Sequence, residues 1–162
     1  MERLLPHARQ VGELLKERKQ TVAVAESSAG GLISAALLAV PGASAYFRGG
    51  AVTYTRHVLL ALKNLDKDQW GELQAATEAY ALFEARTVRE HFGADWGIGE
   101  SGAAGPTGNR YGNPPGHSCV GVCGATEQAL TLNTGSSDRV ANMYAFAECA
   151  LKLLAASLRK SG

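Results

Sequence analysis

A serine that follows a short apolar segment is the first feature of this sequence that could carry out chemistry. Ser27 comes directly after the β-branched run 21–26, and Gly30 and Gly31 lie where a helical pattern begins. Backbone N–H groups at the start of a helix can hold a phosphate, a carboxylate or the oxyanion of an acyl-transfer intermediate. The alternative is that Ser27 or Ser28 only caps the helix. The sequence therefore marks this turn either as a nucleophile and anion site or as a simple cap.

A serine nucleophile requires a base that takes its proton. Tyr54, at the end of the predicted strand 48–54, could relay that proton, and His57 and Lys63 lie downstream of it. Histidine has the intrinsic pKa best suited to a base near pH 7. These residues also have ordinary explanations, because a tyrosine is often half-buried at a strand end and a lysine is usually a solvated surface charge.

Two further features are candidates for ligand binding. The segment 101–116 is rich in glycine and proline and is predicted to be a loop, with six glycines from Gly99 to Gly116. Such a composition is typical of a mobile surface connection. Arg48 precedes two glycines and could bind a phosphate, although an exposed arginine needs no functional explanation.

The elements that must position these residues alternate along the chain. Apolar residues at helical spacing near 4–15 predict a first helix that covers a sheet. Strands are predicted at 21–26, 48–54 and 95–100, and helical patterns occur at 32–40, 56–63 and 75–91. The runs 117–125 and 128–134 predict a hairpin, and Ser136 or Ser137 is predicted to cap a last helix that ends near Arg159.

This order predicts a single domain over residues 1–162 with an α/β fold. We expect a three-layer α/β/α sandwich around a mostly parallel five-stranded sheet, to which the closing hairpin adds an antiparallel member. In such sheets ligands bind beyond the carboxyl ends of the strands. The loops 26–31 and 101–116 should therefore lie near one another at that edge.

The composition excludes several other classes of function. Sixteen basic and fifteen acidic residues give a net charge of +1, far from the basic footprint that nucleic-acid binding needs. The longest apolar stretch ends before Pro41 and is too short to span a bilayer, and the interrupted start of the chain does not resemble a signal peptide. The three cysteines and four histidines lack metal-ligand spacing, so no metal and no cofactor are predicted. We therefore expect a cytoplasmic protein that binds neither nucleic acid nor a membrane.

Four ordered motifs carry a resemblance to a known family. They are AESSAGG (25–31), PGASAYFRGGAVTYT (41–55), SGAAGPTG (101–108) and PPG (114–116). In this order and spacing they resemble the carboxy-terminal domain of the CinA competence-damage proteins, over nearly the whole chain. That family includes stand-alone nicotinamide-nucleotide amidases, which convert nicotinamide mononucleotide to nicotinate mononucleotide and ammonia. The resemblance implies a small, nucleotide-like ligand.

The resemblance also implies roles for individual residues. In the amidases the serine of the first motif is the nucleophile and a tyrosine assists it, and these correspond to Ser27 and Tyr54. N–H groups near Gly30 and Gly31 would hold the oxyanion. The expected substrate-binding residues are Glu26, Gly30, Gly31, Arg48, Gly102, Gly105, Pro106 and Gly108.

One residue of the amidase pattern is replaced in this chain. The amidases have a lysine five residues after the tyrosine, where this sequence has Leu59. On a helix, Lys63 lies one turn further along the same face, about 6 Å away. His57 would point to the other side of that helix, and His117 could enter from the opposite loop. Each of the three is a candidate replacement for the base.

Other positions also depart from the family pattern. Ser28 and Ala29 stand where cysteine and threonine are usual. The helix-opening motif GDRxxVR reads GSSDRVA, so Ser137 and Ala141 occupy the arginine positions while Arg139 lies nearby. The sequence therefore favours two functions, a serine-dependent nicotinamide-nucleotide amidase or a catalytically silent module that binds a nucleotide or phosphorylated small ligand. A third is an accessory subunit, such as a member of a homo-oligomer, whose apolar helical faces serve assembly.

Overall fold

The computed structural model describes residues 1–63 and 73–161. Its strands are β1 (Val22–Glu26), β2 (Phe47–Val52), β3 (Trp96–Ala103), β4 (His117–Cys123) and β5 (Glu127–Asn133). Its helices are α1 (Leu5–Glu17), α2 (Leu32–Leu38), α3 (Arg56–Lys63), α4 (Glu78–His91) and α5 (Arg139–Lys160), with a 3-10 turn η1 (Ala43–Ala45). The order of these elements is the one that the sequence predicts.

The strands form one sheet in the order β2-β1-β3-β4-β5. β1 pairs in parallel with β2 and β3, whereas β4 pairs antiparallel with both β3 and β5. Within the described part of the chain, β4 is therefore the one strand of this sheet that runs against the others. The predicted fold, an α/β structure with a mostly parallel five-stranded sheet and an antiparallel member, is confirmed.

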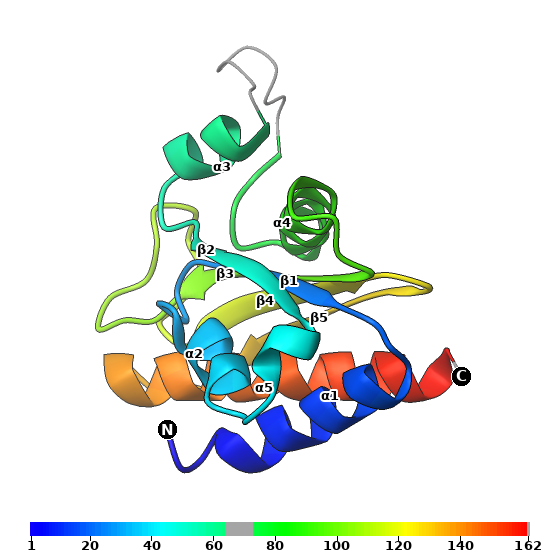
Figure 1. Cartoon of the computed structure of the whole chain (residues 1–162). Coiled ribbons are helices and arrows are strands. Elements are labelled where there is room, and N and C mark those ends of the chain that lie inside the picture. The colour runs from blue at the N-terminus through cyan, green and yellow to red at the C-terminus, as the bar shows by residue number, and fades with distance from the viewer. Residues whose placement is uncertain (64–72, 162) are drawn as a thin grey trace.

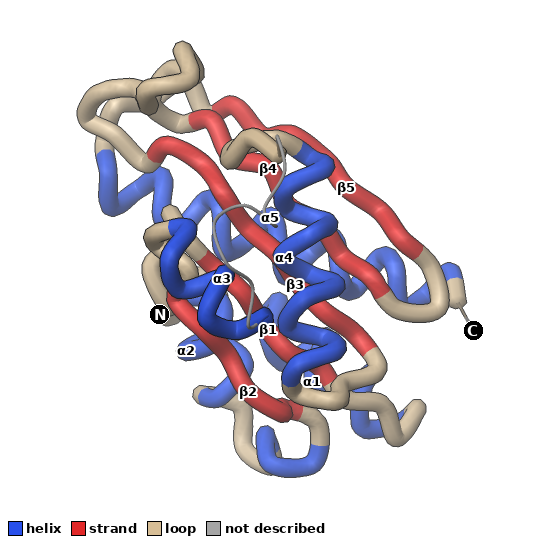
Figure 2. Tube along the Cα trace, turned by 90° about the horizontal axis from the view of Figure 1, so that it is seen from above, coloured by secondary structure: helices blue, strands red, loops and turns tan. Residues whose placement is uncertain are grey.

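Helices cover both faces of the sheet (Figure 1). α4 lies along β3 and β4 on one face, with α3 packed beside it, and Figure 2 shows both helices above the strands. α2 and α5 pack on the other face. α1 was expected to cover the sheet, but it packs mainly on α2 and α5 and so forms the outer part of that layer.

The main hydrophobic core lies between the sheet and the layer that α1, α2 and α5 form. It contains Val24, Ile98 and Val120 from three adjacent strands and Phe146 and Leu154 from α5, all without exposed surface. Removal of this apolar surface from water is the main favourable contribution to folding. The core therefore anchors the sheet whose edge carries the candidate site.

Glycines in the sheet let α4 approach the strands closely. A Cβ atom at Gly99 would lie 1.9 Å from the carbonyl oxygen of Ala81, and one at Gly97 would lie 2.0 Å from that of Ala85. No side chain fits in such a space, so the backbone of α4 rests directly on β3. This contact brings the side chains of α4 to the carboxyl ends of β1 and β3.

Several boundaries differ from the sequence-based expectation: β2 ends at Val52 instead of residue 54, and α4 begins at Glu78 instead of residue 75. β3 continues to Ala103, because Ser101 and Gly102 pair with Cys119 and Ser118 of β4. The predicted loop therefore begins only after these residues. α5 is capped by Asp138, whose carboxylate accepts a hydrogen bond from the N–H of Ala141, and the predicted caps Ser136 and Ser137 were wrong.

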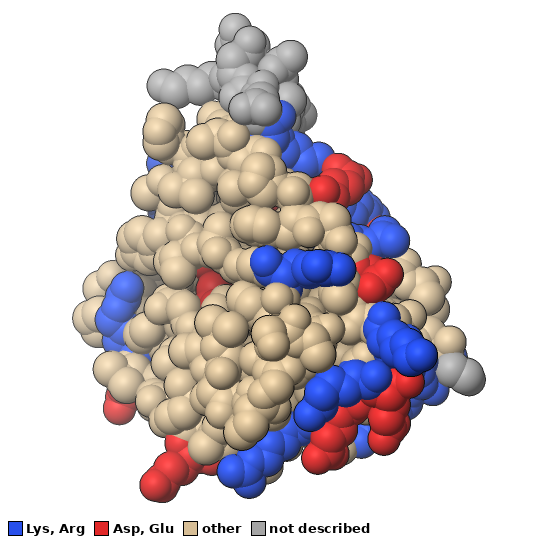
Figure 3. All heavy atoms as spheres, viewed as in Figure 1, with Lys and Arg blue, Asp and Glu red and all other residues tan. Residues whose placement is uncertain are grey.

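Charged residues are distributed in a mixed pattern over the molecule. On the face drawn in Figure 3, basic and acidic side chains intermingle along the lower right edge, and much of the remaining surface is uncharged. This mixture accords with the net charge of +1. Among the helices of residues 1–63 and 73–161, none is long and apolar enough to cross a membrane.

Candidate functional site

The turn between β1 and α2 is held by a buried glutamate at the end of β1. The carboxylate of Glu26 accepts hydrogen bonds from the N–H groups of Ile33 and Ser34, each at 2.9 Å. These N–H groups belong to the first turn of α2, so Glu26 performs the capping that was considered for Ser27 or Ser28. The expected role of Glu26 in substrate binding is a prediction that this contact does not test.

A second buried glutamate, Glu100 on β3, fixes the conformation of the same turn. Its Oε2 accepts the N–H groups of Ser27 at 3.1 Å and Ala29 at 2.8 Å. Its Oε1 accepts the hydroxyl groups of Ser28 and Ser118, the latter at 2.6 Å. Burial raises the pKa of Glu100, while the hydroxyl donors oppose that shift. Glu100 therefore links β1, β3 and β4 at the edge where a ligand is expected.

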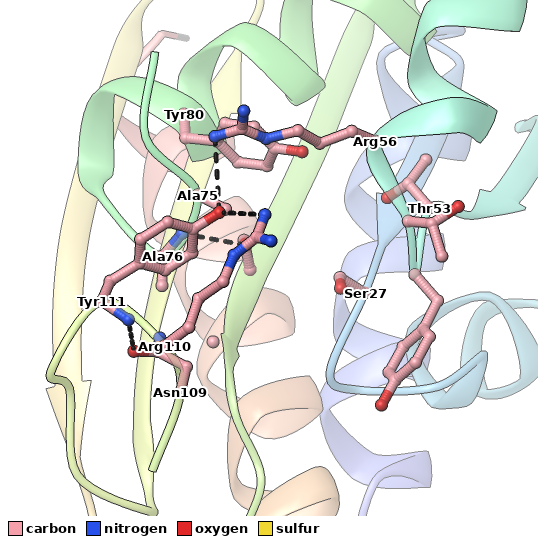
Figure 4. Close-up of a pocket in the computed structure, with 13 residues that line it drawn as sticks. Ser27, Thr53, Arg56, Ala75, Ala76, Tyr80, Asn109, Arg110 and Tyr111 are labelled. Atoms are coloured by element: carbon pink, nitrogen blue, oxygen red, sulfur yellow. Dashed lines mark hydrogen bonds between the residues drawn. The ribbon is translucent and has the colours of Figure 1, made fainter. Parts of the chain in front are cut away.

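A pocket of about 450 Å³ opens beside this turn. Its lining consists of Ser27, Thr53, Tyr54, Thr55, Arg56, Ala75, Ala76, Tyr80, Ser101, Gly102, Asn109, Arg110 and Tyr111. On one side the hydroxyl of Tyr111 lies between two guanidinium groups, and it accepts from Arg110 at 2.9 Å and from Arg56 at 3.4 Å. Figure 4 shows this cluster across the cavity from Ser27 and Thr53. Among the described residues that line the pocket there are two arginines and no carboxylate.

A third buried carboxyl group lies behind this pocket. The hydroxyl of Thr53 donates to Oε1 of Glu84 at 2.7 Å, and Oε2 of Glu84 has no hydrogen-bond partner among the described residues. Glu84 has no exposed surface. Burial raises its pKa well above the usual range, and the nearby Glu100 adds to this effect. Burial therefore favours the protonated form of the Glu84 carboxyl group.

A second, smaller pocket of about 270 Å³ adjoins the first and shares Tyr54, Gly102 and Asn109 with it. Its other lining residues are Ser28, Ala103, Ala104, Gly105, Thr107, Gly108 and Arg139. Arg139 donates to the carbonyl of Gly105 at 2.5 Å and to the hydroxyl of Tyr54 at 3.4 Å. The loop after β3 and the start of α5 thus enclose a cavity with a guanidinium in its wall.

The structure brings together part of the predicted site. Ser27, Tyr54 and Gly102 line the first pocket, and Gly105 and Gly108 line the second. Gly30 and Gly31 lie in the turn itself, where Gly31 caps α2 with a left-handed φ of +98° and the N–H of Gly30 donates to the carbonyl of Ser27. Pro106 lies in the loop beside the second pocket and is exposed, without being part of its lining. Arg48 is exposed on β2 and belongs to neither lining.

Neither Lys63 nor the residue at the position of the family lysine is part of a pocket lining. Leu59, at the position of the family lysine, has no exposed surface and packs with Leu60 and Tyr80. Nζ of Lys63 lies 3.7 Å from the carboxylate of Glu90 and 4.9 Å from the centre of the Phe83 ring. It is therefore directed toward α4 and does not line either pocket.

Neither of the two candidate histidines is part of a pocket lining. His57 is exposed and is part of neither pocket lining. His117 is buried, with Nε2 2.9 Å from the carbonyl oxygen of Ala76 and Nδ1 3.1 Å from Oδ1 of Asn133. Both ring nitrogens of His117 thus have partners, so the ring joins β4 and β5 to the segment before α4.

Sequence reasoning missed several residues of this site. Arg56, Arg110 and Tyr111 were not singled out, because a helical surface arginine and an NRYG turn in a loop carry no signal of their own. Glu84 and Glu100 were missed as well. For Glu100 the available signal was an acidic residue at the end of an otherwise apolar strand, which is uncommon unless the charge has partners.

Comparison with known sequences gives the family. The model of the CinA C-terminal domain matches residues 5–158 of this chain. A CinA-like protein of Chlorobium limicola is 35% identical over 147 residues, which cover 88% of this chain and 34% of that protein. A CinA-like protein of Synechocystis sp. is 41% identical over 129 residues, which cover 80% of this chain and 31% of that protein. The chain thus spans about one third of the length of these curated relatives.

Solved structures share the fold. A competence-damaged protein (CinA) superfamily protein from Klebsiella pneumoniae superposes with a TM-score of 0.89 at 23% identity, covering 97% of this chain and 98% of that one. The competence/damage inducible protein CihA from Agrobacterium tumefaciens has a TM-score of 0.87 at 24% identity, covering 97% and 96%. Since the family model matches nearly the whole chain and curated relatives exceed 30% identity over most of it, the chain belongs to the CinA C-terminal domain family.

Proposed function

We propose that the larger pocket binds a phosphorylated, nucleotide-like small molecule. The observation that carries this proposal is the pair of guanidinium groups, Arg56 and Arg110, that meet at the hydroxyl of Tyr111 in the pocket lining. Guanidinium groups bind phosphate through parallel N–H donors. Tyr80 and Tyr111 are part of the same lining, and aromatic side chains are typical of pockets that bind a planar base. Membership of a family that includes nucleotide amidases supports the same ligand class.

Calorimetric titration of the whole chain tests this proposal. Nicotinamide mononucleotide should bind, and the same nucleoside without phosphate should bind more weakly. Arg110→Gln should lower affinity for the mononucleotide by about 10- to 100-fold, because a hydrogen bond to a charged group contributes about 1.5–3 kcal/mol. Arg48→Gln is the matched control, since Arg48 lies exposed on β2 outside the pocket. Loss of affinity in the Arg48 variant and none in the Arg110 variant would overturn the assignment.

Hydrolysis of nicotinamide mononucleotide to nicotinate mononucleotide and ammonia is a second candidate function. Ser27 and Tyr54 favour it, because both line the pocket. The replacement of the family lysine by Leu59 in a hydrophobic cluster opposes it, and places binding without turnover ahead. Ammonia release between pH 6 and 9 that disappears in Ser27→Ala would decide for the amidase. A cytoplasmic location accompanies either function, because phosphorylated nucleotides do not cross membranes freely.

A further inference from the structure

The hydroxyl of Tyr111 accepts hydrogen bonds from two arginines, which determines where its own hydrogen can point. The oxygen accepts from Arg110 at 2.9 Å and from Arg56 at 3.4 Å. A tyrosine hydroxyl both accepts and donates hydrogen bonds. Because N–H donors of both arginines face the oxygen, the O–H hydrogen is turned away from them. No residue in the part of the chain that the structure describes accepts it.

This hydroxyl belongs to the wall of the larger pocket. Tyr111 is half-buried and lines that pocket together with both arginines. Figure 4 shows the Tyr111 hydroxyl beside the two guanidinium groups, across the cavity from Ser27 and Thr53. Polar groups of this kind in a pocket wall fix the orientation of a ligand and provide specificity. The O–H group of Tyr111 is therefore a donor that a ligand in the pocket can use.

Arg110 offers further donors next to the same hydroxyl. Its guanidinium lies over the Tyr111 ring, 5.1 Å from the ring centre, and one of its Nη2 hydrogens is used for the Tyr111 oxygen. A guanidinium has five N–H donors. Arg110 is exposed, and within the described ranges no acidic side chain forms an ion pair with it. Adjacent N–H and O–H donors of this kind bind the oxygens of a phosphate group.

The turn that carries both residues is held by its own hydrogen bonds. Oδ1 of Asn109 accepts the N–H groups of Tyr111 at 3.0 Å and of Asn113 at 3.1 Å. The N–H of Gly112 donates to the carbonyl of Asn109 at 3.2 Å. These bonds fix the backbone on both sides of Tyr111. A ligand that binds here therefore has little backbone to order, which lowers the entropic cost of binding.

We infer that Tyr111 is a specificity-determining residue of the larger pocket and that its hydroxyl donates to the phosphate group of the ligand. Arg110 donates to the same phosphate group. Arg56 is a positioning residue, because the hydrogen bond that it donates orients the Tyr111 hydroxyl. The inference rests on the proposed function, and it names the contact by which the pocket distinguishes a phosphorylated ligand from an unphosphorylated one.

Calorimetric titration of the native chain and of Tyr111→Phe tests this inference, with nicotinamide mononucleotide and the corresponding nucleoside without phosphate as probes. The substitution keeps the ring beneath Arg110 and removes only the hydroxyl. Affinity for the mononucleotide should fall about 10-fold or more, because a hydrogen bond to a charged group is lost, whereas affinity for the nucleoside should change less than about 2-fold. A purely structural role would weaken both ligands alike, so the difference between them measures the contact with phosphate.

Tyr144→Phe is the matched control. The hydroxyl of Tyr144 accepts from the amino group of Met1, and Tyr144 is not part of the larger pocket. This variant should bind both probes with native affinity. Mononucleotide affinity in Tyr111→Phe that equals or exceeds the native value would overturn the inference and leave the proposed ligand in place. Absence of mononucleotide binding to the native chain would overturn the proposed function, and the inference with it.

Nuclear magnetic resonance of chains labelled with ¹³C at tyrosine Cζ observes the hydroxyl in the native chain. The chain has five tyrosines, and the resonance that is absent from Tyr111→Phe belongs to Tyr111. Addition of the mononucleotide should shift this resonance more than addition of the nucleoside does, and the resonance of Tyr144 should stay in place. A Tyr111 resonance that does not move while the mononucleotide binds would contradict donation to the phosphate group.

Discussion

Replacement of Glu84 by glutamine should change the way in which stability depends on pH. The native carboxyl group is fully buried, Oε2 lacks a partner among the described residues, and burial raises its pKa well above the ordinary value of 4.5. Glu84→Gln keeps the size of the side chain and the acceptor for the Thr53 hydroxyl, but it cannot titrate. The difference in stability between the native chain and the variant therefore reports the titration of the Glu84 carboxyl group.

The direction in which stability changes with pH depends on whether the folded or the unfolded chain binds the Glu84 proton more tightly. Above pH 4.5 the unfolded chain releases the Glu84 proton while the folded chain retains it, so folded protein binds more protons. Stability then falls as pH rises, by about 1.4 kcal/mol for each pH unit up to the folded-state pKa. The variant lacks this decline. Its free energy of unfolding relative to the native chain should increase by about 1.4 kcal/mol per pH unit over that window.

Urea denaturation followed by circular dichroism at pH 5, 6 and 7 measures this difference. Titratable groups that do not interact with Glu84 contribute equally to both chains, so their contributions cancel in the difference. The control is Glu127→Gln, because the Arg86 hydrogen bond lowers the pKa of the exposed Glu127, whose contribution to stability changes only on acidification below about pH 4.5. A constant difference between the Glu84 variant and the native chain from pH 5 to 7 would show that Glu84 is ionised in the folded state.

Two further substitutions test the fold that supports the site. Gly99→Ala should destabilise the chain by about 1–3 kcal/mol or more, because the new Cβ would lie 1.9 Å from the carbonyl oxygen of Ala81. An unchanged melting temperature for this variant would contradict the close packing of α4 on β3. Asp138→Ala should cost about 1 kcal/mol by removing the cap of α5, whereas Ser137→Ala should change stability by less than about 0.5 kcal/mol; equal melting temperatures for these two variants would refute the assignment of the cap.

Local pattern was sufficient for the order of elements. Apolar periodicity and β-branched runs are properties of short segments, so they predicted the strands, the helices and the α/β class. The motif around Ser27 likewise indicated the turn that borders the pockets. Local pattern was insufficient for strand ends and caps, since the end of β3 depends on pairing with β4 and the cap of α5 depends on which side chain reaches the Ala141 N–H.

Contacts between distant segments decided the chemistry of the site. In the sequence, Glu100 is separated from Ser27 by 73 positions and from Ser28 by 72, yet its side chain contacts both residues. Arg56 and Tyr111 form a hydrogen bond although they are 55 positions apart. No local pattern predicts contacts between residues so far apart in the sequence, because these contacts follow from the order in which the strands assemble. The same holds for the direction of Lys63, which its contact with Glu90 determines.

The amino-acid sequence by itself determined the family, the fold class and the turn at which chemistry is expected, since motifs and periodicity are written in neighbouring residues. Only the tertiary structure decided that Leu59 is part of a hydrophobic cluster, that two arginines meet at Tyr111, and that a buried carboxylate faces Ser28. The physical reason is that burial, charge and hydrogen bonding at a site depend on side chains that folding brings together from separate strands and loops.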